Sequence, residues 1–240
     1  LVIGKLFDTI PKSPLEIRPV PPHREKTDAG GSYQGGTPDG SRPGIFYYNS
    51  YDLPSRSNYG VETLFLHEAV PGHHLQIALA REHAELPDYR RSFYTSAFGE
   101  GWGLYAEYLG LEMGFYQEPY NNFGRLTYEM WRAARLVVDT GMHTMGWSRQ
   151  QAIDFLAENT ALSMHNVTTE IDRYISWPAQ ALSYKLGEIT IKQLRAEAEQ
   201  ALGERFNVRE FHDVVLSNGS VPLAVLEQQV RAYIARQQKS

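Results

Sequence analysis

The segment His67-Glu68-Ala69-Val70-Pro71-Gly72-His73-His74 constrains the fold of this chain more than any other. The sequence around it has the apolar periodicity of a helix, but Pro71 has no N–H to donate and its ring crowds the preceding turn. Gly72 has no Cβ and therefore permits unusual backbone conformations. We predict a helix over about residues 60–86 that bulges or kinks at Pro71 and Gly72.

From about residue 60 onward the pattern of the chain is helical. Ser148 and Gln151 form a capping box, and Gly203 suits the position that ends a long amphipathic helix. The sequence predicts helices at about residues 60–86, 92–115, 122–145, 149–159, 166–176, 178–202, 208–217 and 222–237. The fold class we expect is therefore mainly α.

Residues 1–59 hold most of the prolines and two candidate strands, Leu15–Val20 and Gly44–Asn49. Between the strands, the glycine-rich stretch Gly30–Gly36 predicts a flexible loop. It lacks the Lys-Ser/Thr ending of a phosphate-binding loop. We predict a small β element in this N-terminal segment and a helical domain over residues 60–240, together forming one structural unit.

Composition and charge exclude several classes of function. The net charge of −5 argues against a broad nucleic-acid-binding surface. No apolar run approaches the roughly 20 residues that span a bilayer. Because cysteine is absent, disulfides, thiolate metal sites and a cysteine nucleophile are excluded. A metal would have to be bound by His, Asp or Glu.

The histidine-rich segment supplies two kinds of zinc ligand and a candidate base. In the familiar His-Glu-x-x-His helix the two ligands stand at i and i+4, but here the residue at i+4 from His67 is Pro71. His74, at i+7, would lie about 10.5 Å further along a regular helix, too far for two ligands that each sit about 2 Å from one ion. A break at Pro71 would bring His73 into place. We predict His67 and His73 as ligands and Glu68 as general base, with His74 as the reserve ligand or a donor to substrate.

Glu100 is the expected third ligand. It lies 27 residues past His73, enough for one helix to end and a second to return antiparallel. Its neighbours Phe98 and Trp102 indicate burial, and a buried carboxylate needs a partner. Glu107, two turns later, would hydrogen-bond a ligand imidazole. The alternatives are a kinked core helix with incidental histidines and an exposed carboxylate at position 100.

Four stretches of the chain resemble the bacterial "domain of unknown function 885" family: His67–Gln76, Glu100–Glu107, Asp139–Ser148 and Pro178–Gly187. The resemblance runs from Asp39 to Leu223. It implies a helical zincin-like domain and a zinc peptidase distantly similar to the helical His-Glu-x-x-His oligopeptidases and carboxypeptidases. It also implies that the chain is the C-terminal half of a longer protein, with the missing N-terminal half as a partner.

These residues predict a metallopeptidase with one Zn²⁺ and a peptide substrate. Zinc would activate water, and Glu68 would take its proton. Arg42 or Arg173 would bind the C-terminal carboxylate of the peptide, and Gly44–Asn49 would pair with it as an edge strand. The alternative is that both arginines are structural. Three side chains are candidates to stabilise the oxyanion: Tyr184, Tyr174 and His143.

Two other functions stay open at this point. The same ligands would serve a metal-dependent amidohydrolase acting on a small non-peptide amide or ester. A non-catalytic assembly domain would instead use the long amphipathic helices at residues 178–202 and 222–237 as interfaces. A serine hydrolase is not supported, because there is no Gly-x-Ser-x-Gly turn. We expect a soluble bacterial protein, and the sequence leaves its compartment open between cytoplasmic and exported.

Overall fold

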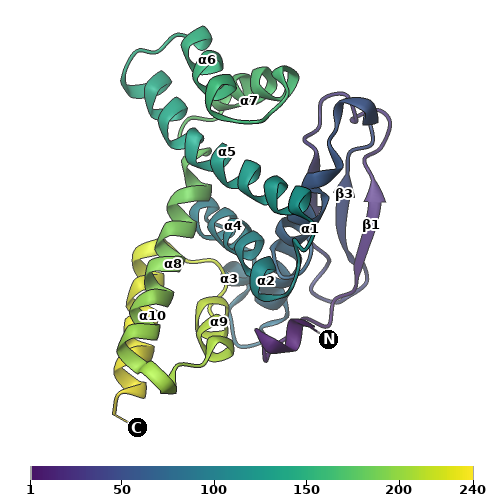
Figure 1. The fold of residues 1–240 in the computed structure, drawn as a ribbon. Helices are drawn as coiled ribbons and strands as arrows, with labels where there is room; N and C mark the ends of the chain where they lie inside the picture. The colour runs from purple at the N-terminus through teal and green to yellow at the C-terminus, as the bar shows by residue number, and fades with distance from the viewer. Residues whose placement is uncertain (1, 240) are drawn as a thin grey trace.

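The computed structural model describes residues 2–239 and is mainly α, with a small sheet near the N-terminus, as predicted. The sheet lies on one side of the molecule in Figure 1, the α8 and α10 helices lie on the other, and α6 and α7 form the top. The helices are α1 (Val61–Glu68), α2 (His73–Glu82), α3 (Asp88–Ser92), α4 (Ser96–Glu112), α5 (Pro119–Thr144), α6 (Arg149–Asn159), α7 (Met164–Ser176), α8 (Leu182–Leu202), α9 (Val208–Leu216) and α10 (Leu223–Gln237). Within the described part of the chain, no helix combines the length and apolar character that crossing a membrane requires.

The sheet has three strands, one more than predicted. Strands β1 (Leu15–Pro19) and β3 (Gly44–Tyr48) match the two expected strands, and β2 (Gly31–Gln34) lies in the stretch that we expected to be a flexible loop. The order is β1-β3-β2, with β1 parallel and β2 antiparallel to β3. The prediction of a loop was wrong because β2 gains its order from pairing with β3, which local composition does not report.

The position of β3 corrects a second prediction. We expected Gly44–Asn49 to be an edge strand available to a peptide, but β3 is the central strand and is paired on both sides. Strands β1 and β2 form the two edges. Of these, β2 contacts α1, so the edge that faces the helical domain is the glycine-containing one.

The predicted helix over residues 60–86 is divided into two helices. Helix α1 ends at Glu68 and α2 begins at His73, so the chain breaks at the Pro-Gly pair instead of bulging there. The Val70–Pro71 peptide bond is cis. A Cβ on Gly72 would lie 1.9 Å from the carbonyl oxygen of His67, so this turn requires glycine.

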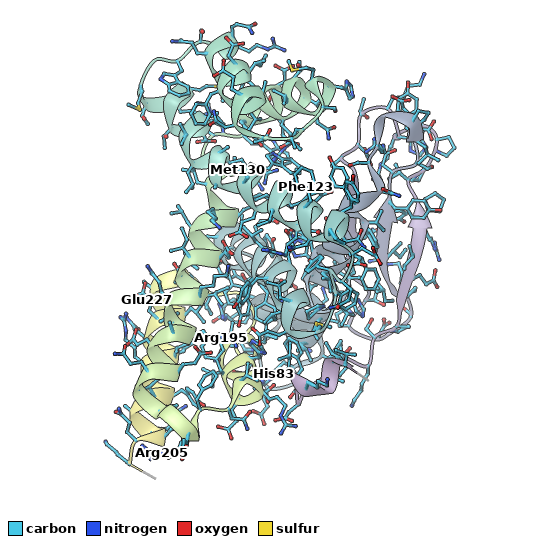
Figure 2. All side chains as sticks on the ribbon, viewed as in Figure 1. His83, Phe123, Met130, Arg195, Arg205 and Glu227 are labelled. Carbon is cyan, nitrogen blue, oxygen red and sulfur yellow. The ribbon has the colours of Figure 1, made fainter. Side chains whose placement is uncertain are left out.

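Among the described residues, α4 and α8 form the most extensive helix–helix contact. A Cβ on Gly101 would lie 2.4 Å from the Cα of Gly187, so two glycines permit the backbones to touch. One apolar cluster joins α4 and α8 to α9, α10 and the N-terminal segment, and a second joins α5, α6 and α7. Figure 2 shows Phe123 and Met130 on α5, where both side chains are exposed. Helix α4 also packs against α1, with Glu100 and Glu107 beside His67.

Candidate metal centre

The structure brings together the three residues that the sequence predicts as ligands. His67 comes from the last turn of α1, His73 from the first turn of α2, and Glu100 from α4. The Nε2 atoms of both histidines lie 3.4 Å from the same oxygen, Glu100 Oε2. All three potential ligand atoms lie within 4.8 Å of one another. The break between α1 and α2 therefore brings the two imidazoles close together, as adjacent turns do in a regular His-Glu-x-x-His helix.

Close packing of α4 against α1 positions His67. A Cβ on Gly103 would lie 2.6 Å from the imidazole of His67, so only glycine leaves room for this ring. The rings of His67 and His73 are nearly perpendicular, at 89°, with centroids 4.7 Å apart. His67 and His73 are both buried, as is most of the Glu100 side chain.

The geometry of these donors fits a divalent ion. Two ligands bound about 2 Å from one tetrahedral zinc lie about 3.3 Å apart, which agrees with both 3.4 Å separations. Glu100 Oε2 is buried and has no hydrogen-bond partner, and neither has His73 Nδ1. A buried carboxylate oxygen without a donor is costly, and a bound cation would remove that cost.

The electrostatics of the cluster also favour a cation. Burial opposes the charged form of His67, but the nearby carboxylates of Glu100, Glu107 and Glu68 outweigh it and raise the pKa of this histidine to about 9. Burial also opposes the charge on Glu100, yet His73 and His67 hold the pKa of this carboxyl well below its usual range. The site thus concentrates negative charge around two imidazoles.

Glu107 occupies the position that the sequence predicts for it. His67 Nδ1 donates a 2.8 Å hydrogen bond to Glu107 Oε1, and the side chain of Glu107 is 2% exposed. Because a carboxylate only accepts hydrogen bonds, this contact requires a proton on Nδ1, so the neutral form of His67 carries its lone pair on Nε2. Arg132, which the sequence analysis missed, lies 3.1 Å from the same oxygen of Glu107.

Glu68 lies in the same pocket as the three ligand candidates. The pocket has a volume of about 310 Å³. Burial raises the pKa of Glu68, partly offset by His73 and His67. The pocket is lined by Gly31, Ser32, Tyr33, His67, Glu68, His73, Ile77, Tyr94, Glu100 and Tyr184.

Two tyrosines flank the ligand candidates. Tyr184, one of the predicted catalytic residues, lines the pocket with its ring nearly parallel to that of His67 and 6.1 Å from it. Tyr94 was not predicted; its hydroxyl donates a long, 3.4 Å hydrogen bond to Glu100 Oε1. The ring of Tyr94 packs where Gly99 has no side chain, since a Cβ on Gly99 would lie 2.3 Å from it. In the sequence, this glycine was the only local indication that a bulky group approaches α4 there.

His74, the reserve ligand, points away from the cluster. Its Nδ1 pairs with the hydroxyl of Tyr33 at 2.9 Å, and burial lowers the pKa of His74. A Cβ on Gly44 would lie 2.6 Å from the same nitrogen, so β3 begins with the residue that makes room for it. His74 therefore joins α2 to the sheet, and the geometry favours His73 over it.

Two of the predicted oxyanion donors lie outside the pocket. Tyr174 is 1% exposed and packs in the cluster of α5, α6 and α7, where its hydroxyl accepts hydrogen bonds from Arg135 and Trp131. His143 is exposed near the end of α5, and its Nε2 donates to the backbone oxygen of Tyr174. The sequence spacing between these two residues and the candidate ligands did not indicate that they would lie outside the pocket.

Neither predicted carboxylate-binding arginine lines the pocket. Arg173 pairs with Glu170 at 2.9 Å and with the side-chain oxygen of Gln180 at 2.7 Å. The backbone of Arg42 hydrogen-bonds Thr37, closing the turn before β3. The structural alternative thus describes Arg173 better than a substrate-binding role.

Comparisons with known proteins place these features in a family. The model of the bacterial protein of unknown function family DUF885 matches residues 2–230. The solved structure of a "putative lipoprotein" from Colwellia psychrerythraea is 44% identical, with a TM-score of 0.96, and the match covers 98% of this chain and 40% of that one. A "putative lipoprotein of unknown function" from Shewanella oneidensis is 26% identical, with a TM-score of 0.74, covering 93% and 41%.

No curated protein matches the sequence. The chain spans about two fifths of the length of the two solved relatives. Because the family model covers nearly the whole chain, this protein belongs to DUF885, a family of bacterial proteins of unknown function.

Proposed function

We propose that this protein is a zinc-dependent peptidase. The observation that carries the proposal is the placement of two imidazole nitrogens 3.4 Å from one unpartnered buried carboxylate oxygen, with a second carboxylate in the same pocket. His67, His73 and Glu100 would hold the ion. Bound there, zinc would lower the pKa of water and polarise the scissile carbonyl.

Glu68 is the proposed general base. Burial raises the pKa of Glu68, partly offset by His73 and His67, which makes this carboxylate a better proton acceptor than an exposed one. Glu68 would take a proton from the attacking water as the carbon–oxygen bond forms. It would then deliver that proton to the amine nitrogen as the carbon–nitrogen bond breaks.

Tyr184 is the proposed donor to the developing oxyanion. It lines the pocket beside His67, and burial raises the pKa of its phenol, so the hydroxyl keeps its proton at neutral pH. Tyr94, which already donates to Glu100, is the second tyrosine within reach of the same space.

An extended peptide is the substrate that the walls of the pocket support. Gly31, Ser32 and Tyr33 of β2 line it, and β2 pairs with another strand on one side only. The unpaired edge of such a strand offers backbone hydrogen bonds to an extended chain. The substrate-pairing role that we predicted for Gly44–Asn49 therefore passes to β2.

Two further proposals follow from the relatives. Because the chain spans two fifths of their length, the remainder of a longer protein would supply additional walls of the cleft. The relatives' description as lipoproteins supports export from the cytoplasm.

Metal analysis and one substitution test the function. We expect one zinc per chain, peptide cleavage that a chelator abolishes, and a Glu68→Gln variant that retains zinc but loses about 10²- to 10⁴-fold in kcat. Glu85→Gln is the matched control, since Glu85 is exposed and lies outside the pocket. Cleavage by metal-free protein would contradict the proposal. Hydrolysis of small non-peptide amides but not of peptides would support the amidohydrolase alternative. A purified protein that contains no zinc would support an assembly domain.

A further inference from the structure

Arg132, on α5, is not one of the ligand candidates, but it lies beside Glu107. Its side chain is 4% exposed, and its Nη2 lies 3.1 Å from Glu107 Oε1. The same oxygen accepts the 2.8 Å hydrogen bond from His67 Nδ1. One carboxylate oxygen therefore connects a buried guanidinium to a candidate ligand.

Aromatic rings hold the guanidinium of Arg132 in place. It lies 4.5 Å from the ring centre of Tyr128 and 4.7 Å from that of Trp131. Its Nη1 also donates a 3.2 Å hydrogen bond to the backbone oxygen of Tyr128. These contacts come from α5 itself, so α5 presents Arg132 to Glu107 as a rigid element.

The link matters because Glu107 is almost inaccessible to water. A carboxylate with 2% of its surface exposed needs partners to fix its orientation. Glu107 in turn orients the His67 ring, so that Nε2 faces Glu100. Outer partners of this kind hold a ligand in its metal-binding tautomer and direction.

We propose that Arg132 is a positioning residue that acts through Glu107 on His67 and so strengthens zinc binding. This inference rests on the proposed zinc site but not on peptide hydrolysis. Loss of an outer partner typically weakens metal binding by about 10- to 100-fold, and we expect an effect of this size when Arg132 is replaced.

The test compares two neighbouring buried arginines by zinc titration against a chromophoric chelator at fixed pH. Arg132→Met keeps an unbranched side chain against the rings but removes the charge. Arg135→Met is the matched control, because Arg135 is 3% exposed and, like Arg132, lies against the rings of Trp131 and Tyr184, yet it pairs with Glu170 and not with Glu107. Glu170 retains Arg173 as a second partner in that variant.

The expected result is about 10- to 100-fold weaker zinc binding in Arg132→Met, less than about threefold in Arg135→Met, and partial recovery in Arg132→Lys. Melting temperatures of the metal-free proteins measure any loss of stability independently of zinc affinity. Unchanged zinc affinity in Arg132→Met would overturn the inference, and so would an equal loss in Arg135→Met, which would indicate a general packing effect.

A double substitution keeps the test decisive where Arg132→Met does not fold. Arg132→Gln combined with Glu107→Gln replaces the ion pair by two amides that can hydrogen-bond. If Arg132 acts through Glu107, the double variant binds zinc no more weakly than Glu107→Gln alone, whereas additive losses would overturn the inference. Wild-type protein that binds no zinc would refute the metal site itself. Equal zinc affinity in the wild-type protein and the Arg132 variants would refute only the role of Arg132.

Discussion

Two buried histidines in this molecule have opposite electrostatic surroundings. His67 lies between Glu100 and Glu107, which raise its pKa to about 9 against the effect of burial. His212, in α9, has no exposed surface, and burial lowers its pKa to about 4. Burial alone therefore lowers the pKa of an imidazole, whereas nearby carboxylates raise it and favour a positive charge at that position.

The hydrogen bonds of His212 explain why it stays neutral. Its Nδ1 donates to the backbone oxygen of Leu6 at 2.8 Å, and its Nε2 accepts from the hydroxyl of Tyr105 at 2.9 Å. Arg195 of α8, labelled in Figure 2, donates to the same hydroxyl at 3.0 Å. His212 thus joins the N-terminal segment to α4 and α9 as a structural residue.

The largest difference between the two histidines should be in metal affinity. We expect His67→Ala to weaken zinc binding by more than the roughly 100-fold upper range for an outer partner, because a ligand is lost. His212→Ala should leave zinc affinity within about threefold while lowering stability, since it removes two buried hydrogen bonds. Isothermal titration with zinc checks both, and comparable losses would remove the distinction between the two sites.

His212 should make the free energy of unfolding depend on pH. Its pKa is about 4 in the folded protein and 6.5 in the unfolded chain. Below pH 6.5 the unfolded state binds a proton that the folded state does not, so stability falls as the pH decreases from 6.5 to 4. At about 1.4 kcal/mol per pKa unit, the loss reaches about 3 kcal/mol at pH 4, where the folded histidine is half protonated.

Urea unfolding at several pH values between 7 and 4 measures this loss. The His212→Gln variant is the control, because it lacks the titrating group while all other ionisable residues remain. The difference in unfolding free energy between the two proteins isolates His212. A difference that does not change with pH would show that the buried histidine is not responsible.

Gly103 offers a way to disturb the candidate metal site without changing a proposed ligand. We expect Gly103→Ala to push the His67 ring aside, since the new Cβ would lie 2.6 Å from it. Overpacking of this kind costs about 1–3 kcal/mol, offset in part by the higher helix propensity of alanine. Zinc affinity should fall about tenfold or more, a change of about 1.4 kcal/mol. Unchanged zinc binding would show that the imidazole can move without cost.

Local sequence was sufficient to predict the candidate ligands but not to choose between neighbours. The break at Pro71 and Gly72 was evident, and the spacing to Glu100 predicted a returning helix. The choice of His73 over His74 depends on how the chain leaves the turn, and on Tyr33, which lies 41 residues away and pairs with His74. Such a contact has no signature in the segment itself.

The features that sequence analysis missed all depend on contacts between distant segments. Strand β2 is ordered by its pairing with β3, and Arg132 matters because α5 carries it to Glu107. Tyr174 packs in the cluster of α5, α6 and α7, and the exposed His143 donates to the backbone oxygen of Tyr174. The glycines of α4 predicted close approach to this helix, but not that the rings of Tyr94 and His67 would pack against Gly99 and Gly103.

The smallest expected effect concerns the hydroxyl that connects His212 to Arg195. Tyr105→Phe leaves the Nε2 of His212 without its donor, whereas Arg195 keeps Glu112 at 2.7 Å. We expect a loss of about 1 kcal/mol in urea unfolding at pH 7 and no change in zinc affinity. Tyr108→Phe is the matched control on the same helix, because its ring, 4.1 Å from Lys192 Nζ, keeps that contact without the hydroxyl. Equal losses in the two variants would indicate that the hydrogen bond to His212 contributes no net stability, and the neutral histidine would then be held by burial alone.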